Sequence, residues 1–233
     1  MEALRENFFN LQVYGQVFPY LLNGLWSTVW LSLLVIPLGL LTGLALAIVA
    51  TRSRPRWPRV LVAIHVDFFR AFPPLVLLIF IYFATPFFGW DMPKLAAVAL
   101  GFTLNTSSYY AEVFRAGLSS VPKGQDEAAR STGLGAWQAL CYVTIPQATR
   151  NVLPDLLGNS IEVVKMTTLA SVVALPELLK AARDAQSMIY NPSPVVLAAL
   201  MYLLLLWPLV RLLSHIERRH LGQARRRVRQ KPA

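Results

Sequence analysis

The sequence predicts an all-α integral membrane protein with five transmembrane helices and an N-terminus outside. Of the 233 residues, 55% are hydrophobic and only 15% are charged, and the mean hydropathy is +0.48. Soluble domains of this size carry more charge. Apolar runs long enough to cross a bilayer recur along the chain. We therefore expect a single transmembrane domain, residues 1–233, with spans at about 20–50, 60–83, 94–116, 152–175 and 194–213.

The distribution of basic residues predicts the orientation. The net charge is +10, and most basic residues lie in segments 52–59, 115–150 and 211–231. Because Lys and Arg concentrate in cytoplasmic loops, these segments should share the cytoplasmic side. They do so only with five spans and an external N-terminus, which makes residues 215–233 a basic cytoplasmic tail. This topology explains the charge, so we expect a lipid membrane and no nucleic acid as a partner.

Several kinds of chemistry are not expected of this chain. A single cysteine, Cys141, excludes an internal disulfide and a cysteine metal cluster. The three histidines lack the spacing of metal ligands. The sequence contains no phosphate-binding glycine loop, metalloprotease motif or nucleophile elbow. We therefore expect neither an enzyme nor catalytic residues, no metal, and no cofactor on this chain.

The first span should pack closely against another helix. Gly39 and Gly43 form a Gly-xxx-Gly pair, which lets helix backbones approach. Contact within the chain and contact with a second copy are both compatible with this pair. Residues 1–19 are expected to form a separate amphipathic lead-in at the membrane interface.

The second span should contain a charged pair and a break. Asp67 and Arg70 lie three residues apart, so on a helix they can pair and reduce the cost of placing charge near lipid. Pro73 and Pro74 should end the helix. A structural ion pair at a kink and a substrate contact are both open interpretations.

The third and fourth spans carry polar side chains at membrane depth. Such groups require a protein partner or a water-filled pathway. A buried structural network is the alternative to a pathway, and Glu162 can also pair with Lys165. Asp67, Arg70 and Lys165 are expected to be structural intramembrane charges. The expected pathway contacts are Asn105, Ser108, Tyr109, Asn159 and Glu162.

The longest polar interruption of the apolar sequence is the segment 121–154. Its apolar residues recur at helical spacing on both sides of Gly133-Leu134-Gly135. This pattern predicts a short amphipathic helix, a turn, and a second helical run ending near Pro146. The segment is too polar to cross a membrane and too short to have its own core, so we expect another protein to hold it.

This segment resembles the cytoplasmic loop, called the EAA loop, of ATP-binding cassette (ABC) importer permeases. The family pattern is Glu-Ala-Ala, three residues, Gly, nine residues and Ile-x-Leu-Pro. Here Glu127-Ala128-Ala129 is followed at the same spacing by Gly133 and by Val143-Thr144-Ile145-Pro146, with Val for Ile and Ile for Leu. The loop is thereby identified as a docking site for an ATPase, with cytoplasmic coupling helices between the third and fourth spans.

Three further segments resemble the polar amino-acid branch of these permeases, the histidine, glutamine, glutamate and arginine type. Residues 104–112 with 115–117 resemble a pattern in the third span, 70–73 resemble Arg-Gly-Thr-Pro, and 165–169 resemble Lys-Asp-Thr-Ser-Leu. Asn159 stands where relatives that carry cationic substrates tend to have Glu, which argues against a strictly cationic amino acid. Residues 176–193 resemble an external amphipathic segment of this branch.

The resemblance implies the membrane subunit of an ATP-driven importer in a bacterial cytoplasmic (inner) membrane. ATP and Mg would be bound by separate ABC ATPase subunits, which would grip the docking loop, residues 121–148. A second permease subunit, the same or a sister chain, would complete the pathway, and an extracytoplasmic solute-binding protein would deliver the amino acid. The expected ATPase-docking residues are Gly124, Glu127, Ala128, Ala129 and Gly133.

Two other functions remain open from the sequence. A secondary, gradient-driven transporter would need no ATPase, although such chains are usually longer and contain internal repeats. A non-transporting membrane sensor subunit would also use a docking loop. Uptake measured with and without an ATPase distinguishes the three. The identity of the amino acid, the choice between homodimer and heterodimer, and the role of Glu162 are not determined by the sequence.

Overall fold

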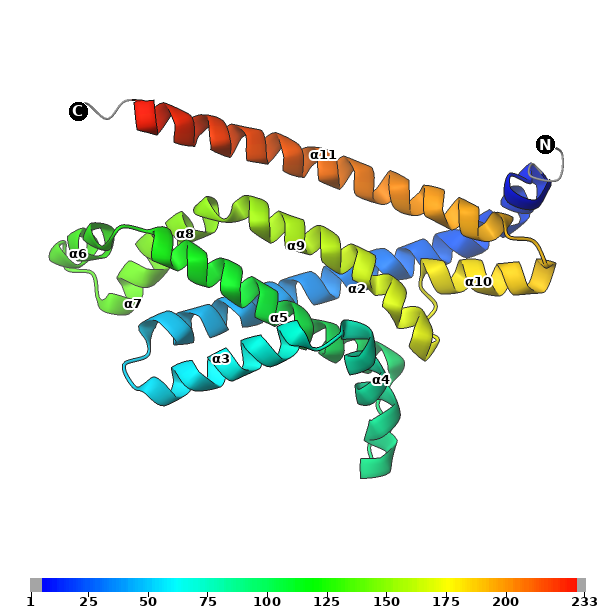
Figure 1. Cartoon of the computed structure of the whole chain (residues 1–233), viewed down its shortest axis with the longest axis horizontal. Helices are drawn as coiled ribbons and strands as arrows, with labels where there is room; N and C mark the ends of the chain where they lie inside the picture. The colour runs from blue at the N-terminus through cyan, green and yellow to red at the C-terminus, as the bar shows by residue number, and fades with distance from the viewer. Residues whose placement is uncertain (1–5, 230–233) are drawn as a thin grey trace. The chain divides into compact units, whose positions relative to one another are not determined.

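A computed structural model describes residues 6–229, with side chains described to residue 218, and this part of the chain is helical without strands (Figure 1). The all-α prediction is therefore confirmed. The elements in chain order are α2 (Leu11–Arg52), α3 (Arg56–Ala71), α4 (Pro74–Ala84), η1 (Thr85–Phe88), α5 (Lys94–Ser120), α6 (Lys123–Ser131), α7 (Ala136–Ala139), η2 (Leu140–Thr144), α8 (Ile145–Asn151), α9 (Leu153–Met166), η3 (Thr167–Val173), α10 (Leu178–Ile189) and α11 (Ser193–Arg229).

Within the described part of the chain, three helical stretches are long and apolar enough to cross a membrane, namely Glu6–Arg52, Leu153–Val173 and Ser193–Arg218. The pair α3 and α4 adds a fourth crossing if its two parts, bent by 101°, count as one. Helix α5 has the length of a crossing, with 27 residues, but the polar run in its middle lowers its hydropathy. The structure thus supports several membrane crossings, while the total of five remains a prediction.

Residues 11–19 of the expected lead-in are continuous with the first long helix, with no break near residue 20. Helix α2 begins at Leu11, where the Asn10 side chain accepts hydrogen bonds from the backbone N–H groups of Gln12 and Val13, at 3.1 and 3.2 Å. This side chain is a typical helix N-cap. Val13 and Val17 are then buried in the protein core. Residues 1–5 of the lead-in lie outside the described residues.

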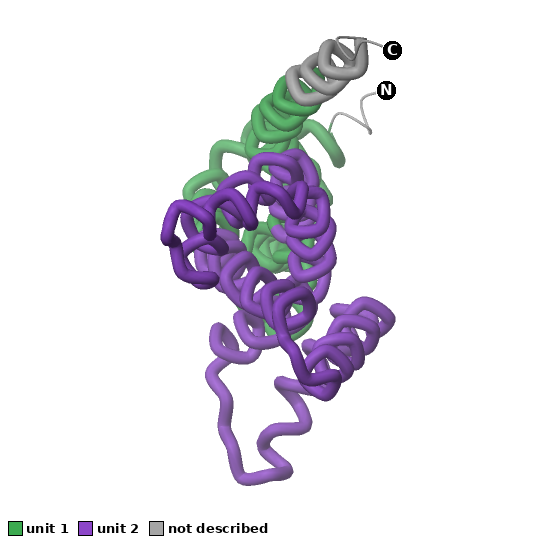
Figure 2. Tube along the Cα trace, turned by 90° about the vertical axis from the view of Figure 1, so that its left-hand side faces the viewer, with its two compact units in different colours: residues 1–30, 164–233 green, residues 31–163 purple. Residues whose placement is uncertain are grey.

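The residues of the expected single domain divide into two compact units (Figure 2). One consists of residues 1–30 and 164–233, and the other of residues 31–163. The second unit contains the EAA-like segment and all five of the expected pathway residues.

In the second unit, α5 is the central helix. Helices α3, α4 and α8 all pack against it. The Gly39–Gly43 pair also meets α5, because a Cβ built on Gly43 would lie 2.5 Å from the Cβ of Tyr110. Only glycine allows the two backbones to approach this closely. The Gly-xxx-Gly pair is therefore used for packing within the chain.

In the first unit, the N-terminal part of α2 contacts α10. A Cβ on Gly24 would lie 2.9 Å from the Cβ of Ala181. The buried face of α10 contains Leu178, Ala182 and Ala185, which share a core with Val17 of α2. The amphipathic helix predicted within residues 176–193 is thus present.

Candidate functional site

Helix α6 exposes part of the EAA-like motif on the surface of its unit. The helix begins after Pro122 and carries Asp126 in its first turn and Arg130 in its last, so both charges suit the helix dipole. Gly124, Glu127 and Ala128 are exposed. Their spacing of three and four residues places them on one face of a helix.

Ala129 behaves differently from the residue before it, because it is buried. Its methyl group holds α6 against the rest of the unit. The expected docking set therefore divides into an exposed face and a residue that seats the helix. A larger side chain at Ala129 would therefore displace α6 by disturbing packing within this chain, and not by removing a contact with a partner protein.

The turn after α6 depends on Gly133, whose φ angle is +94°. Its N–H donates to the carbonyl of Arg130 at 3.1 Å, and the N–H of Thr132 donates to Ala128 at 3.3 Å. A Cβ at Gly133 would meet nothing within 4 Å. Glycine is therefore required by the backbone conformation and not by lack of space.

The second helical run contains a π-helix, which the sequence pattern did not predict. Elements α7, η2 and α8 follow one another from Ala136 to Asn151, so the run continues past the predicted end near Pro146. The N–H of Ile145 donates to the carbonyl of Leu140, five residues earlier. Pro146 has no N–H and clashes with the carbonyl four residues before it in an α-helix. The wider π turn accommodates this proline, and such turns are frequent at functional sites.

Two aromatic side chains of this run are exposed. Trp137 is 65% exposed and Tyr142 is 73% exposed. The helical spacing of the apolar residues in this segment did not predict that these two side chains would be exposed. Large exposed aromatic residues mark protein–protein interfaces more often than chance. We add Trp137 and Tyr142 to the candidate docking surface.

The base of the loop is anchored to α5. Leu140 and Ala148 are buried in one cluster with Leu118 of α5. The Asn151 side-chain amide donates to the hydroxyl of Ser120 at 2.8 Å. The loop is therefore fixed at its base and exposed at α6 and α7.

Asn105 lies at the break between α3 and α4. The carbonyl of Phe69 would normally accept from the N–H four residues later, but that residue is Pro73, which has none. The side-chain amide of Asn105 donates to this carbonyl at 2.8 Å. Asn105 is 3% exposed, so its role in the structure is to satisfy the helix break.

The neighbouring polar residues of α5 differ in their burial and in the groups that they contact. Ser108 is fully buried, and its hydroxyl donates to the carbonyl of Asn105 at 2.6 Å. The hydroxyl of Ser107 lies 3.0 Å from Nε2 of His65 on α3. Tyr109, by contrast, is 37% exposed.

The contact partner of Arg70 differs from the one that the sequence predicted. Its guanidinium lies over the ring of Tyr109, 5.6 Å from the centroid, which is a cation–π geometry. The predicted Asp67–Arg70 ion pair is not formed among the described side chains. Tyr109, on another helix, thus takes the place of Asp67 as the partner of Arg70.

The expected pathway residues of α9 lie on its more accessible surface. Asn159 is half-buried and Glu162 is exposed, as is Lys165, which was expected to be a structural charge. Within the 31–163 unit, Ser160 is bonded to Tyr110, with 2.9 Å between the two hydroxyl oxygens. Helix α9 therefore uses Ser160 for packing against α5 and leaves Glu162 accessible.

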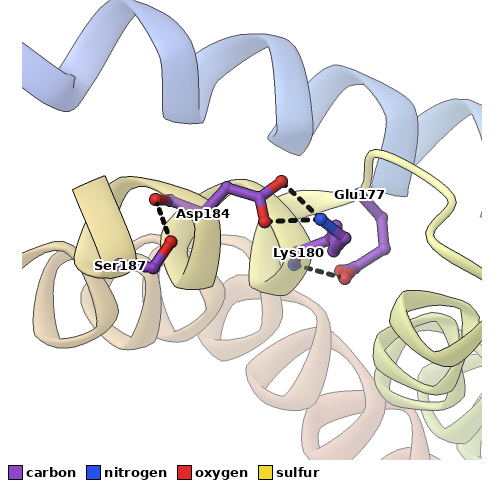
Figure 3. Close-up of polar contacts among 4 residues, drawn as sticks. All are labelled: Glu177, Lys180, Asp184 and Ser187. Atoms are coloured by element: carbon purple, nitrogen blue, oxygen red, sulfur yellow. Dashed lines mark hydrogen bonds and ion pairs between the residues drawn. The ribbon is translucent and has the colours of Figure 1, made fainter.

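In the other unit, Glu177 forms a buried polar centre at the start of α10. Its carboxylate accepts from the N–H groups of Leu179 and Lys180, at 2.8 and 2.6 Å, and from the hydroxyl of Tyr202 at 2.8 Å. Figure 3 shows this cap beside the Lys180–Asp184 ion pair. Burial raises the pKa of the Glu177 carboxyl, against the lowering effect of these hydrogen bonds. The sequence analysis did not single out Glu177.

Among the described residues, no three His, Cys, Asp or Glu side chains are grouped to hold a metal ion. This is a helical membrane protein whose helices carry polar side chains and whose exposed loop is anchored at its base. These are the features of a permease. The comparisons place it more narrowly. The chain belongs to the family of binding-protein-dependent transport system inner membrane components, which matches residues 36–221. Members of this family are transport subunits and not enzymes, and they span the membrane.

Curated relatives are amino-acid permeases. The probable amino-acid ABC transporter permease protein YckA of Bacillus subtilis is 36% identical over 180 residues, covering 76% of this chain and 78% of that protein. The probable glutamine ABC transporter permease protein GlnP of Bacillus subtilis is 39% identical, covering 61% and 67%. The L-cystine transport system permease protein TcyB of Bacillus subtilis is 31% identical, covering 91% and 90%.

Solved structures give the same fold. A crystal structure of an amino acid ABC transporter with histidines matches with a TM-score of 0.78 and 34% identity, covering 88% of this chain and 95% of that chain. An inward-facing MetNI methionine ABC transporter matches with a TM-score of 0.71 and 21% identity, covering 86% and 96%. At that identity the second likeness concerns the fold alone.

Proposed function

We propose that the chain is the membrane-spanning permease subunit of an ATP-driven importer that translocates a polar amino acid delivered by an extracytoplasmic solute-binding protein. One observation carries the proposal: the EAA-like segment forms a loop that is anchored at its base, and its expected docking residues Gly124, Glu127 and Ala128 are exposed on the surface. The names of the relatives, which include amino-acid, glutamine and cystine permeases, support the substrate class.

The proposed topology has five spans, an external N-terminus and a bacterial inner-membrane location. The basic segments 52–59, 115–150 and 211–231 support it, because all three then face the cytoplasm. Helix α6 and the π-helical run become cytoplasmic coupling helices. The family name, which refers to an inner membrane component, agrees with this location.

We assign the energy source to partner subunits. Two ABC ATPase subunits would bind ATP and Mg and grip the loop of each permease, and a second copy or sister permease would complete the pathway. Closure of the ATPase pair would draw the two loops together and favour an outward-open state. This coupling requires that ATP binds the two states with different affinity. Glu127 would form polar contacts with the ATPase, and Trp137 would fill an apolar pocket there.

The substrate contacts are proposed on the accessible part of the expected set. The Tyr109 hydroxyl and the Asn159 amide would contact the α-carboxylate, and Glu162 would contact the α-ammonium group. Asn105 and Ser108 support this surface from behind, because both are buried in the packing of α5. We retain Asp67, Arg70 and Lys165 as structural charges.

Reconstitution tests this function. The permease is placed in proteoliposomes with its ATPase and solute-binding protein, and uptake of radiolabelled amino acids is measured with ATP, with a non-hydrolysable analogue and with ion gradients alone. Uptake only with hydrolysable ATP supports the proposal. Gradient-driven uptake would indicate a secondary transporter, and no uptake under any condition a sensor subunit. Thermal-shift screening of the solute-binding protein then identifies the amino acid.

A further inference from the structure

Helix α6 is loosely attached on one side. It packs against η2 and α7. Towards the ends of α2 and α5, however, a cavity of about 530 Å³ lies beneath it. Residues of α2, α5, α6 and η2 line the cavity, among them Thr51, Arg52, Ser119, Lys123, Asp126 and Thr144. Because an open cavity provides little apolar contact, packing alone couples the position of α6 only weakly to that of α2.

Among the described side chains, one ion pair joins α2 to α6 across this cavity. Nη2 of Arg52 lies 3.3 Å from Oδ1 of Asp126, which joins residues 74 positions apart. Arg52 is the last residue of α2, and Asp126 lies in the first turn of α6. Each charge is therefore placed where the dipole of its own helix favours it. Both helix dipoles thus stabilise the charges of this pair in addition to their mutual attraction.

The pair is too exposed to matter for stability. The side chain of Arg52 is 39% exposed and that of Asp126 is 24% exposed. Ion pairs at such positions contribute little to the free energy of unfolding. Their effect on the position of a loosely attached helix is different, because a small free-energy difference is enough to shift a conformational equilibrium.

We propose that Arg52 and Asp126 form a clasp that positions α6 relative to α2 and transmits movement of the docked loop to the first span. Helix α5 is already connected to α6 through the chain at Val121 and Pro122. The clasp gives α2 a second connection, so that α2 and α5 move together when the loop is displaced. Both residues are positioning residues and neither is assigned to substrate or to the ATPase. The inference rests on the proposed function, because it concerns how that loop drives transport.

A charge swap tests the clasp in the reconstituted complex of permease, ATPase and solute-binding protein. The variants are R52D, D126R and the double variant R52D/D126R. Arg56 provides the control, since it is the first residue of α3, four positions after Arg52, and is exposed, and its side chain has no ion pair among the described residues. The measured quantity is the number of amino acids transported for each ATP hydrolysed, together with ATPase subunits retained on purification.

We expect R52D and D126R each to lower this ratio about fivefold or more, the scale of typical allosteric coupling. ATPase retention should be unchanged, and the double variant should recover most of the ratio. R56D should behave like the wild type. Unchanged ratios in both single variants, or a double variant no better than the poorer single variant, would overturn the clasp.

A second measurement does not depend on transport. Spin labels at Ala45 of α2 and Ser131 of α6, in a Cys141→Ser background, report the distance between the two helices. The distance distribution should broaden in R52D and narrow again in R52D/D126R, whereas equal distributions in all three would also overturn the proposal. If the wild-type complex shows no ATP-driven uptake, the proposed function fails, and these distances still decide whether the clasp exists.

Discussion

The buried polar side chain of Asn105 is explained by a single missing backbone N–H. Pro73 deprives the carbonyl of Phe69 of its normal donor, and Asn105 supplies one at 2.8 Å. The sequence pattern placed Asn105 in a helix, and in the structure it lies in α5. The pattern did not reveal the acceptor, which lies 36 residues earlier on another helix. The orientation of a buried amide is decided by tertiary contacts that no helical pattern contains.

Asn105→Leu should destabilise the protein by about 1–3 kcal/mol, because the carbonyl of Phe69 becomes a buried acceptor without a donor. Thermal unfolding in detergent measures the loss. Pro73→Ala is the informative partner change, since it provides an N–H for the same carbonyl. Asn105→Leu should then cost clearly less in a Pro73→Ala background. Strict additivity of the two changes would show that Asn105 has some other role.

Glu177 makes stability depend on pH in a definite direction. Its pKa in the folded protein is raised above the ordinary value of 4.5. The folded state therefore binds a proton more readily than the unfolded state between these two values, so stability falls as pH rises through that window. Glu177→Gln removes this titration. The unfolding temperature of the wild type relative to Glu177→Gln should rise as pH is lowered from neutral, and a constant difference across the window would contradict the argument.

At the scale of elements, the EAA-like loop was largely predictable. Its short helix, its turn at Gly133 and its second helical run all follow from apolar spacing and glycine placement. The π-helix and the exposure of Trp137 did not follow, because they depend on Pro146 and on how Leu140 packs below the loop. The Asp67–Arg70 pair failed for a similar reason, since the ring of Tyr109 on α5 attracts Arg70.

Gly133→Asp should reduce ATP-driven uptake about tenfold or more while the ATPase remains assembled, because a strained turn misplaces the α6 face. Uptake and subunit retention are measured on the same preparations. Gly89 is a matched control: its φ is +78°, a Cβ there also meets nothing within 4 Å, and it lies outside the loop. Gly89→Asp imposes similar strain and should leave uptake nearly intact. Equal loss in both variants would indicate general destabilisation.

Trp137→Ala should weaken ATPase binding, with a lower yield of ATPase subunits on purification of the tagged permease. Truncation of a buried aromatic anchor at an interface typically costs about 2 kcal/mol or more. Trp90 is the control, because it is 69% exposed, close to the 65% of Trp137, but follows η1. Trp90→Ala should retain the ATPase. Retention of the ATPase by Trp137→Ala would remove Trp137 from the docking surface.

At the scale of the whole molecule, composition and charge were the most informative features. They predicted a helical membrane protein, and the family match over residues 36–221 supports that class. The number of crossings was harder to read, because α5 is polar in its middle and α3 and α4 are bent by 101°. The polar run belongs to α5, which packs against α3, α4 and α8, and average hydropathy does not register such packing.

The central claim is that the loop containing Glu127 lies in the cytoplasm, where an ATPase can hold it. Because Cys141 is the single cysteine, Glu127→Cys in a Cys141→Ser background provides one reactive thiol. Met188, which is 78% exposed on α10, provides the opposite marker as Met188→Cys. A membrane-impermeant maleimide should label position 127 in inside-out vesicles and position 188 in right-side-out vesicles. Labelling of position 127 in right-side-out vesicles would contradict the account.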